Sequence, residues 1–126
     1  MKDFRNLKVW ECAHHVALEV YKATSKFPRE EVYGLTAQLR RASVSIPSNI
    51  AEGCGRNSDA DFARLLQIAM GSASETEYQL LLGRDLGMLS LEEYGELQAD
   101  LEEVKRMLSG LLKTLRPKSR VLAAES

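Results

Sequence analysis

The stretch Gln38-Leu-Arg-Arg-Ala-Ser-Val-Ser-Ile-Pro-Ser-Asn-Ile-Ala-Glu-Gly53 decides the fold of this chain. Apolar residues recur in and just before it at spacings of three and four, so they share one helical face. This apolar row consists of Leu35, Leu39, Ala42, Ile46 and Ile50. Pro47 lies in the middle, where a proline removes a backbone hydrogen bond at a cost of roughly 3 kcal/mol. The pattern therefore predicts a long helix with a kink at Pro47.

A second row, made of polar residues, runs beside the apolar row at the same helical spacing. It consists of Gln38, Arg41, Ser45, Asn49 and Glu52. A solvated helix face usually carries Lys and Glu, whereas Ser and Asn are mediocre helix formers. We therefore expect a hydrogen-bonded network that is buried or lies between subunits. Two alternatives remain open for this row, a solvated face and a ligand-binding or catalytic site.

Four helical patterns with short connections account for the chain. We expect helices over about 7–26, from about Glu30 to Gly53 or Gly55, over about 59–86 and over about 91–115. Ser58 and Ser90 are the expected N-caps of the last two helices. Short loops between long amphipathic helices predict an all-α, antiparallel up-down-up-down four-helix bundle. The bundle domain is expected over residues 1–116, with a flexible C-terminal tail over 117–126.

The third helix carries a polar row of its own, which consists of Ser72, Glu75 and Gln79. If the second and third helices fold back near Arg56, Arg41 becomes level with about Gly71, and Glu75 lies one turn away. We therefore predict an ion pair between Arg41 and Glu75, formed within one subunit or between two. Gly71 is expected to let the two helices approach closely.

Composition is that of a water-soluble globular domain. The chain has 126 residues, of which 28% are charged and 44% hydrophobic, enough for one modest core. Its longest uncharged runs are about half of what a membrane span needs, and the first residues lack the apolar segment of a signal peptide. Two cysteines provide neither a disulfide framework nor a zinc spacing. We expect a cytoplasmic protein that does not bind membranes.

Charge is distributed unevenly along the chain. The net charge of −1 is not that of a general nucleic-acid coat protein. Residues 105–120, however, contain six basic residues and no acidic one. An oligomer could gather such residues into a ring, and we therefore consider them as nucleic-acid contacts. They are Lys105, Arg106, Lys113, Arg116, Lys118 and Arg120.

Patterns that would support catalysis or metal binding are weak. Metal-binding four-helix bundles need two Glu-x-x-His pairs, and the chain has one, Glu11-Cys-Ala-His14. No serine or cysteine lies in a recognisable nucleophile motif, and the segment from Gly53 to Arg56 lacks the Lys-Ser/Thr of a phosphate-binding loop. We therefore predict no catalytic residue, no metal and no cofactor, and an enzyme is the least favoured interpretation.

The string Ser45-Ile-Pro-Ser-Asn-Ile-Ala-Glu-Gly53 resembles the signature of the bacterial 23S rRNA intervening-sequence proteins. Supporting pieces follow in the order of that family, and the match covers roughly residues 4–115. They are Leu7-Lys-Val-Trp10, Phe27-Pro28, Tyr33-Gly34-Leu35, Gln38-Leu-Arg-Arg41 and Gly71-Ser-Ala-Ser-Glu75.

The resemblance implies a homopentamer of four-helix subunits that acts as a non-enzymatic scaffold and binds RNA or an RNA-handling protein. A related accessory protein of diversity-generating retroelements forms a similar pentamer and binds reverse transcriptase and nucleic acid. The alternative function is therefore that of an accessory subunit of a reverse transcriptase.

Overall fold

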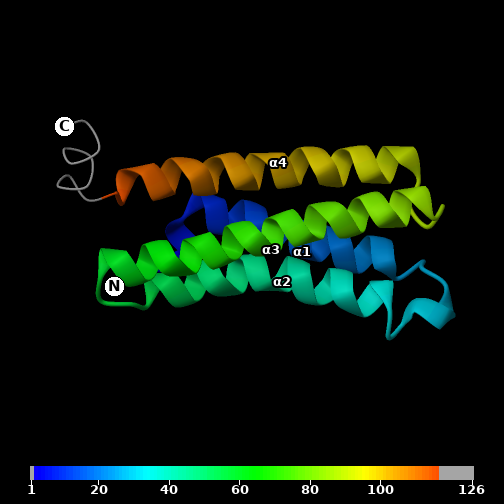
Figure 1. Ribbon diagram of the computed structural model, residues 1–126, viewed down its shortest axis with the longest axis horizontal. Helices are drawn as coiled ribbons and strands as arrows, with labels where there is room; N and C mark the ends of the chain where they lie inside the picture. The colour runs from blue at the N-terminus through cyan, green and yellow to red at the C-terminus, as the bar shows by residue number, and fades with distance from the viewer. Residues whose placement is uncertain (1, 117–126) are drawn as a thin grey trace.

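Four long helices make up the fold in a computed structural model that describes residues 2–116. They are α1 (Lys8–Thr24), α2 (Leu35–Cys54), α3 (Asp59–Asp85) and α4 (Leu91–Thr114), with short 3₁₀ turns at Phe4–Asn6 and Arg29–Glu31. The helices lie side by side, and the chain turns back at each of the three connections (Figure 1). The described part of the chain contains no strand. The predicted all-α fold with four helices is confirmed.

The ends of α3 and α4 form as the sequence predicts. The hydroxyl oxygen of Ser58 accepts a hydrogen bond from the backbone amide of Asp61 at 3.1 Å. Ser90 accepts from the amide of Glu93 at 3.0 Å, and the Glu93 carboxylate accepts from the amide of Ser90 at 3.2 Å, which completes a capping box. Gly87, after the end of α3, has a φ of 77°, a left-handed conformation that glycine adopts without steric cost.

The predicted start of the second helix is wrong by about five residues. Residues Arg29–Glu31 form a separate 3₁₀ turn, and α2 begins only at Leu35. The reason is the Glu31 side chain, whose Oε1 accepts a hydrogen bond from the backbone amide of Leu35 at 2.9 Å. A carboxylate in this position satisfies one of the free amides at the start of a helix, so it lies outside that helix. From there α2 runs through Pro47 to Cys54 without interruption.

The core lies along the centre of the bundle, and α2 contributes its predicted apolar row to it. Every member of the α2 row is at most 6% exposed. The corresponding inward positions of α3 are buried, and so are the four central heptad positions of α4, Leu97, Leu101, Val104 and Leu108. Burial of one Leu or Ile side chain contributes about 1.5–3 kcal/mol, so these rows supply most of the drive for folding.

Helices α2 and α3 pack tightly near the turn that joins them. A Cβ atom added to Gly53 would lie 2.7 Å from Cδ1 of Phe62, closer than non-bonded carbon atoms approach. Phe62 is itself only 3% exposed, so its ring has no free space to move into. The absence of a side chain at Gly53 therefore permits this close contact.

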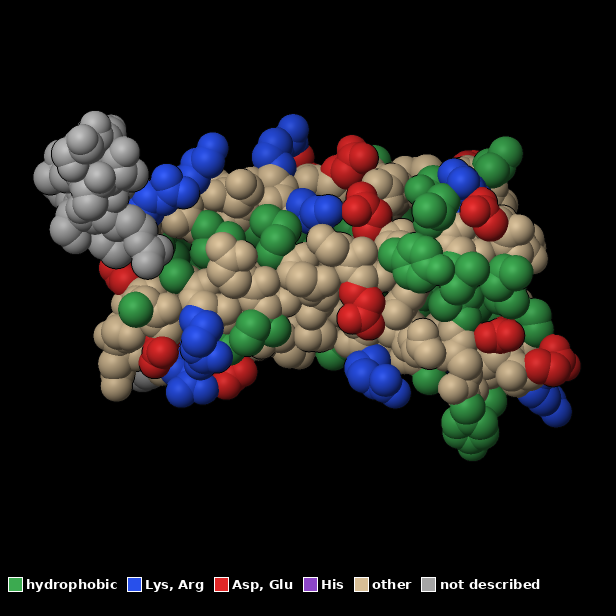
Figure 2. Space-filling view, in the orientation of Figure 1, with side chains coloured by type: hydrophobic (Ala, Val, Ile, Leu, Met, Phe, Trp, Pro, Cys, Tyr) green, Lys and Arg blue, Asp and Glu red, His purple; other side chains and the backbone are tan. Residues whose placement is uncertain are grey.

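The surface charge of α4 changes sign along the helix. Its first half carries acidic residues, and its second half, from Lys105 onward, carries basic ones. Figure 2 shows Lys and Arg side chains gathered toward the C-terminal end of α4, with Asp and Glu side chains farther along the same edge. Among residues 2–116, no helix combines the length and hydropathy that a membrane span requires.

Candidate functional site

The strongest candidate is the α2/α3 polar face, defined by the eight residues of the two predicted polar rows. At its centre, the hydroxyl groups of Ser45 and Ser72 lie 2.8 Å apart and join the two helices. The side-chain amide of Asn49 donates to the carbonyl oxygen of Ser45 at 2.8 Å and to its hydroxyl oxygen at 2.9 Å. All three residues are half-buried. A hydrogen-bonded network of three half-buried side chains therefore joins α2 to α3 within a single chain.

The outer members of the α2/α3 polar face point to solvent. Gln38, Arg41, Glu52 and Glu75 are exposed. Glu52 forms an ion pair of 2.7 Å with Arg56 one turn further along α2. Exposed pairs of this kind contribute less than about 1 kcal/mol. In a single chain the face is thus a network at its centre and a solvated surface at its edges.

Arg41 and Glu75 do not form an ion pair within the chain, since no contact within 4.0 Å joins them among residues 2–116. The Ser45–Ser72 contact fixes the register, because helices that run in opposite directions then place Arg41 level with about Thr76. Arg41 and Glu75 therefore lie at similar heights but both extend away from the bundle. An ion pair between Arg41 of one subunit and Glu75 of another therefore remains a prediction.

The expected role of Gly71 is wrong. A Cβ atom added there would have no heavy atom within 4 Å, so this glycine is not needed for the approach of α2 to α3. Gly53 has that role instead. In a single chain, Gly71 is an exposed helical glycine without a packing function.

Gln79 is the one buried member of the α2/α3 polar face, at 6% exposure. Its side-chain amide donates to Oε1 of Glu75 at 3.2 Å. Its carbonyl oxygen Oε1 has no hydrogen-bond partner in the part of the chain that is described. A buried acceptor without a partner costs about 1–3 kcal/mol, so Gln79 lowers the stability of the isolated subunit.

A second polar cluster joins α3 to α4 and was missed by the sequence analysis. Glu77 accepts hydrogen bonds from the side-chain amide of Gln98 at 2.8 Å and from the ammonium group of Lys105 at 3.0 Å. These two hydrogen bonds hold the pKa of Glu77 below its ordinary value of 4.5. Applying the hairpin register to the third and fourth helices, with the turn near Met88, would have placed Gln98 beside Glu77.

We expect Glu77→Gln to lower the free energy of unfolding at pH 7 by about 1 kcal/mol, because Lys105 loses its partner. A carboxyl group whose pKa falls on folding contributes stability above its unfolded pKa and loses it as the pH falls through its folded pKa. The difference between the variant and the wild type should therefore shrink in acid. Urea unfolding at pH 7 and pH 3 measures it, and an undiminished difference at pH 3 contradicts the assignment. Glu96→Gln, at an exposed carboxyl on the neighbouring helix α4, is the matched control.

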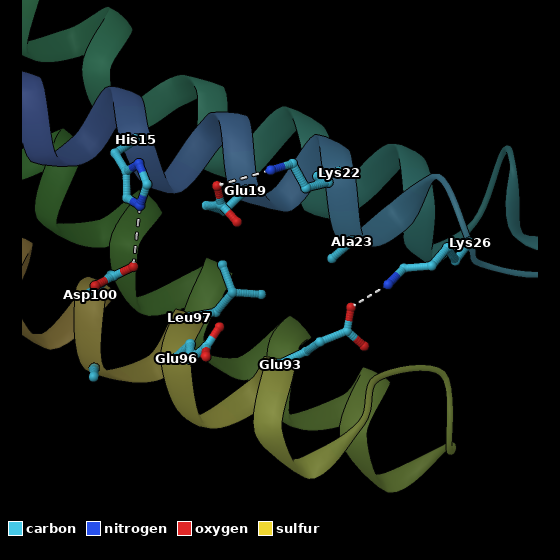
Figure 3. Close-up of a pocket in the computed structure, with 10 residues that line it drawn as sticks. His15, Glu19, Lys22, Ala23, Lys26, Glu93, Glu96, Leu97 and Asp100 are labelled. Atoms are coloured by element: carbon cyan, nitrogen blue, oxygen red, sulfur yellow. Dashed lines mark hydrogen bonds and ion pairs between the residues drawn. The ribbon is translucent and has the colours of Figure 1, made fainter.

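A charged groove of about 480 Å³ separates α1 from α4. Nε2 of His15 lies 3.6 Å from Oδ2 of Asp100, and Nζ of Lys26 lies 2.6 Å from Oε2 of Glu93. Figure 3 shows both pairs facing each other across the groove. The hydrogen bond from Lys26 holds the pKa of Glu93 below its ordinary value. These two ion pairs link the helices, whereas the exposed Glu96 also lines the groove and forms no ion pair among residues 2–116.

The single Glu-x-x-His pattern does not form a metal site. The His14 ring stacks on Trp10, with ring centroids 4.9 Å apart and planes inclined by 10°. Glu11 lines a groove between α1 and α4 that His14 does not line. Among residues 2–116, no group of three or more His, Cys, Asp or Glu side chains could hold a metal ion. Burial raises the pKa of the Cys54 thiol, which disfavours the reactive thiolate.

An apolar groove of about 430 Å³ runs between α1 and α2 and borders the α2/α3 polar face. We call it the α1/α2 apolar groove; its walls include Trp10, Leu18, Tyr21, Val44 and Pro47. Leu18 is 54% exposed and Tyr21 46% exposed. Hydrophobic side chains that gather on a surface mark sites of association more often than side chains scattered singly do.

The predicted nucleic-acid contacts divide into three groups. Lys105 and Arg106 form ion pairs with Glu77 and Glu103 respectively. Lys113 and Arg116 are exposed, and no ion pair involves either of them among the described residues. Lys118, Arg120 and the tail 117–126 lie outside the residues that the structure describes.

Comparison with known proteins agrees with the fold. A family model described as "23S rRNA-intervening sequence protein" matches residues 5–110. A crystal structure of a protein with unknown function, from the S23 ribosomal protein family of Bacteroides thetaiotaomicron VPI-5482, is 29% identical in sequence. The alignment covers 83% of this chain and 98% of the Bacteroides chain, with a TM-score of 0.76. No curated protein matches the chain.

Proposed function

Because the chain belongs to the family of 23S rRNA-intervening sequence proteins, we propose that it is a non-enzymatic scaffold that forms a homo-oligomer and binds RNA or an RNA-handling protein. In this proposal the antiparallel, up-down-up-down bundle is one subunit of a homopentamer, the number implied by the family resemblance. The observation that carries the proposal is the pair of neighbouring surfaces on α2, the α2/α3 polar face and the α1/α2 apolar groove.

These two surfaces suit a ring. A closed ring with five subunits needs a heterologous interface, in which two different surfaces of each subunit meet. The α1/α2 apolar groove supplies apolar area to bury. The exposed ends of the α2/α3 polar face supply Arg41 and Glu75, which form no ion pair among residues 2–116 and could pair with a neighbouring subunit. Small residues such as Gly71 leave room for that neighbour.

The chemistry of the described residues supports a binding role over an enzymatic one. Among the described residues, the charged side chains of the groove between α1 and α4 pair with one another apart from Glu96, as His15 does with Asp100. Burial raises the pKa of the Cys54 thiol. In the lone Glu-x-x-His pair, His14 stacks on Trp10 and Glu11 lines a groove beside α4. Among residues 2–116, none of the clusters and grooves described above combines a nucleophile, a general base and an oxyanion-stabilising donor of the kind that acyl or phosphoryl transfer requires.

Size-exclusion chromatography with light scattering tests the proposal, with absorbance recorded at 260 and 280 nm on protein purified without nuclease. We expect a mass of five subunits and an excess of 260 nm absorbance from bound RNA. A pentamer without nucleic acid supports the scaffold and directs attention to a protein partner. A monomer overturns the proposed assembly.

Reversal of one charge tests whether Arg41 and Glu75 pair between subunits. We expect Arg41→Glu to raise the dissociation constant of the oligomer by roughly tenfold, because two carboxylates then face each other. Glu75→Arg should do the same, and the double variant should restore assembly. Both side chains are exposed and form no ion pair among residues 2–116, and Glu75 accepts only a hydrogen bond from Gln79, so the subunit itself should stay folded. Sedimentation at several concentrations measures assembly, and failure of the double variant to recover it rejects the pairing.

A further inference from the structure

A groove between the first turns of α3 and the last turns of α4 differs in charge from the others. It has a volume of about 450 Å³, and three basic side chains line it, Arg64 from α3 and Lys113 and Arg116 from α4. None of its lining residues is acidic. Its remaining walls combine two polar side chains, Gln67 and Ser109, with apolar ones. We call this the α3/α4 basic groove.

The positive charge of the α3/α4 basic groove is largely unneutralised. Neither Lys113 nor Arg116 forms an ion pair among residues 2–116. Arg64 is held only loosely, with Nε 3.9 Å from Oδ1 of Asp61 and the side chain 56% exposed. Basic residues earlier on α4 are different, because Lys105 is engaged by Glu77 at 3.0 Å and Arg106 by Glu103. The groove is therefore where the excess positive charge of α4 is available to a ligand.

We infer that the α3/α4 basic groove binds the phosphodiester backbone of RNA. This inference rests on the proposed function, since it names the surface through which the scaffold takes RNA. Arg64, Lys113 and Arg116 lie on two sides of one groove, so they contact phosphates along a strand that lies in it. Arginine also presents two parallel N–H groups that match a phosphate.

The uncharged walls of the groove define the mode of recognition. Gln67 and Ser109 supply hydrogen-bonding groups for phosphate oxygens or ribose hydroxyls, and Met70 and Leu112 supply an apolar floor. No aromatic side chain lines the groove, so it has no platform on which a base could stack. Binding through this groove is therefore independent of base sequence and depends strongly on salt.

Charge reversal in the groove tests the inference on the full chain in its native assembly state. The test variant is Arg64→Glu with Lys113→Glu; the control is Arg29→Glu with Lys8→Glu, which makes the same change of net charge at exposed positions outside the groove. The probe is a fluorescein-labelled, mixed-sequence single-stranded RNA of 20 nucleotides, with binding measured by anisotropy at several salt concentrations. Circular dichroism and light scattering establish that both variants are folded and assembled like the wild type.

We expect the groove variant to bind RNA at least about tenfold more weakly than the wild type and the control to stay within about twofold. The slope of log affinity against log salt should fall by about 1.4, because each lost single-strand phosphate contact removes about 0.7. Equal losses in the groove and control variants overturn the inference and leave the RNA-binding scaffold standing. A wild type that binds no RNA overturns the inference together with the RNA-binding form of the proposed function, and leaves only a scaffold for a protein partner. If an acidic peptide displaces RNA at equal concentration, the groove is a site for a protein partner and the inference fails.

Discussion

Replacing Gly53 by valine is expected to lower the free energy of unfolding by about 2–3 kcal/mol, because it overfills the tight contact between Gly53 of α2 and Phe62 of α3. The first added carbon would lie 2.7 Å from Cδ1 of Phe62 and 3.4 Å from Cβ of Leu65. Both residues are almost fully buried. The two helices must therefore move apart, which also strains the Ser45–Ser72 hydrogen bond further along the interface.

The matched control for this prediction is Gly95→Val. Gly95 is also inside a helix, but a Cβ atom added there meets no heavy atom within 4 Å. Valine has a slightly better helix propensity than glycine, so this variant should be as stable as the wild type or slightly more stable. Urea unfolding of both variants at one protein concentration measures the difference. Equal stabilities would show that the Gly53 contact is not tight in solution.

Periodicity was sufficient to predict the helices and the core. The apolar row of α2 depends only on the spacing of residues along a helix, and all five of its members are buried. The caps at Ser58 and Ser90 are local in the same way, since each involves residues three positions apart. The start of α2 was not predictable from periodicity, because it depends on a carboxylate, Glu31, that turns toward an amide four residues later.

Contacts between helices were predicted less well, because they depend on register and on the direction of each side chain. The network of Ser45, Asn49 and Ser72 formed as expected, since small polar side chains can pair only with near neighbours. Arg41 and Glu75 are long and can extend into water, so matching heights along two helices did not make them a pair within the chain. The α3/α4 basic groove could not be predicted from the sequence, because Arg64 and Lys113 are 49 positions apart along the chain.

Replacing Leu101 by alanine is expected to cost about 3–4 kcal/mol of unfolding free energy, the largest loss among the substitutions considered. Leu101 is fully buried at the middle of the α4 heptad row. Removing its outer carbons loses their burial and leaves a cavity that the helices cannot close without giving up contacts elsewhere. Thermal and urea unfolding measure the loss, which is a large fraction of the 5–15 kcal/mol that typical domains possess.

Leu91→Ala is the control for that substitution, since Leu91 lies on the same helix and is 78% exposed. Its effect should stay within about 0.5 kcal/mol. Leu101→Ala leaves every surface residue in place, so at low temperature, where the variant is still folded, it should bind RNA with unchanged affinity. Lys113→Glu should do the reverse, weakening RNA binding without loss of stability. Equal stabilities of Leu101→Ala and Leu91→Ala would contradict the assignment of Leu101 to the core. If Leu101→Ala instead weakened RNA binding while folded, binding would depend on the packing of α4 and not on surface charge alone.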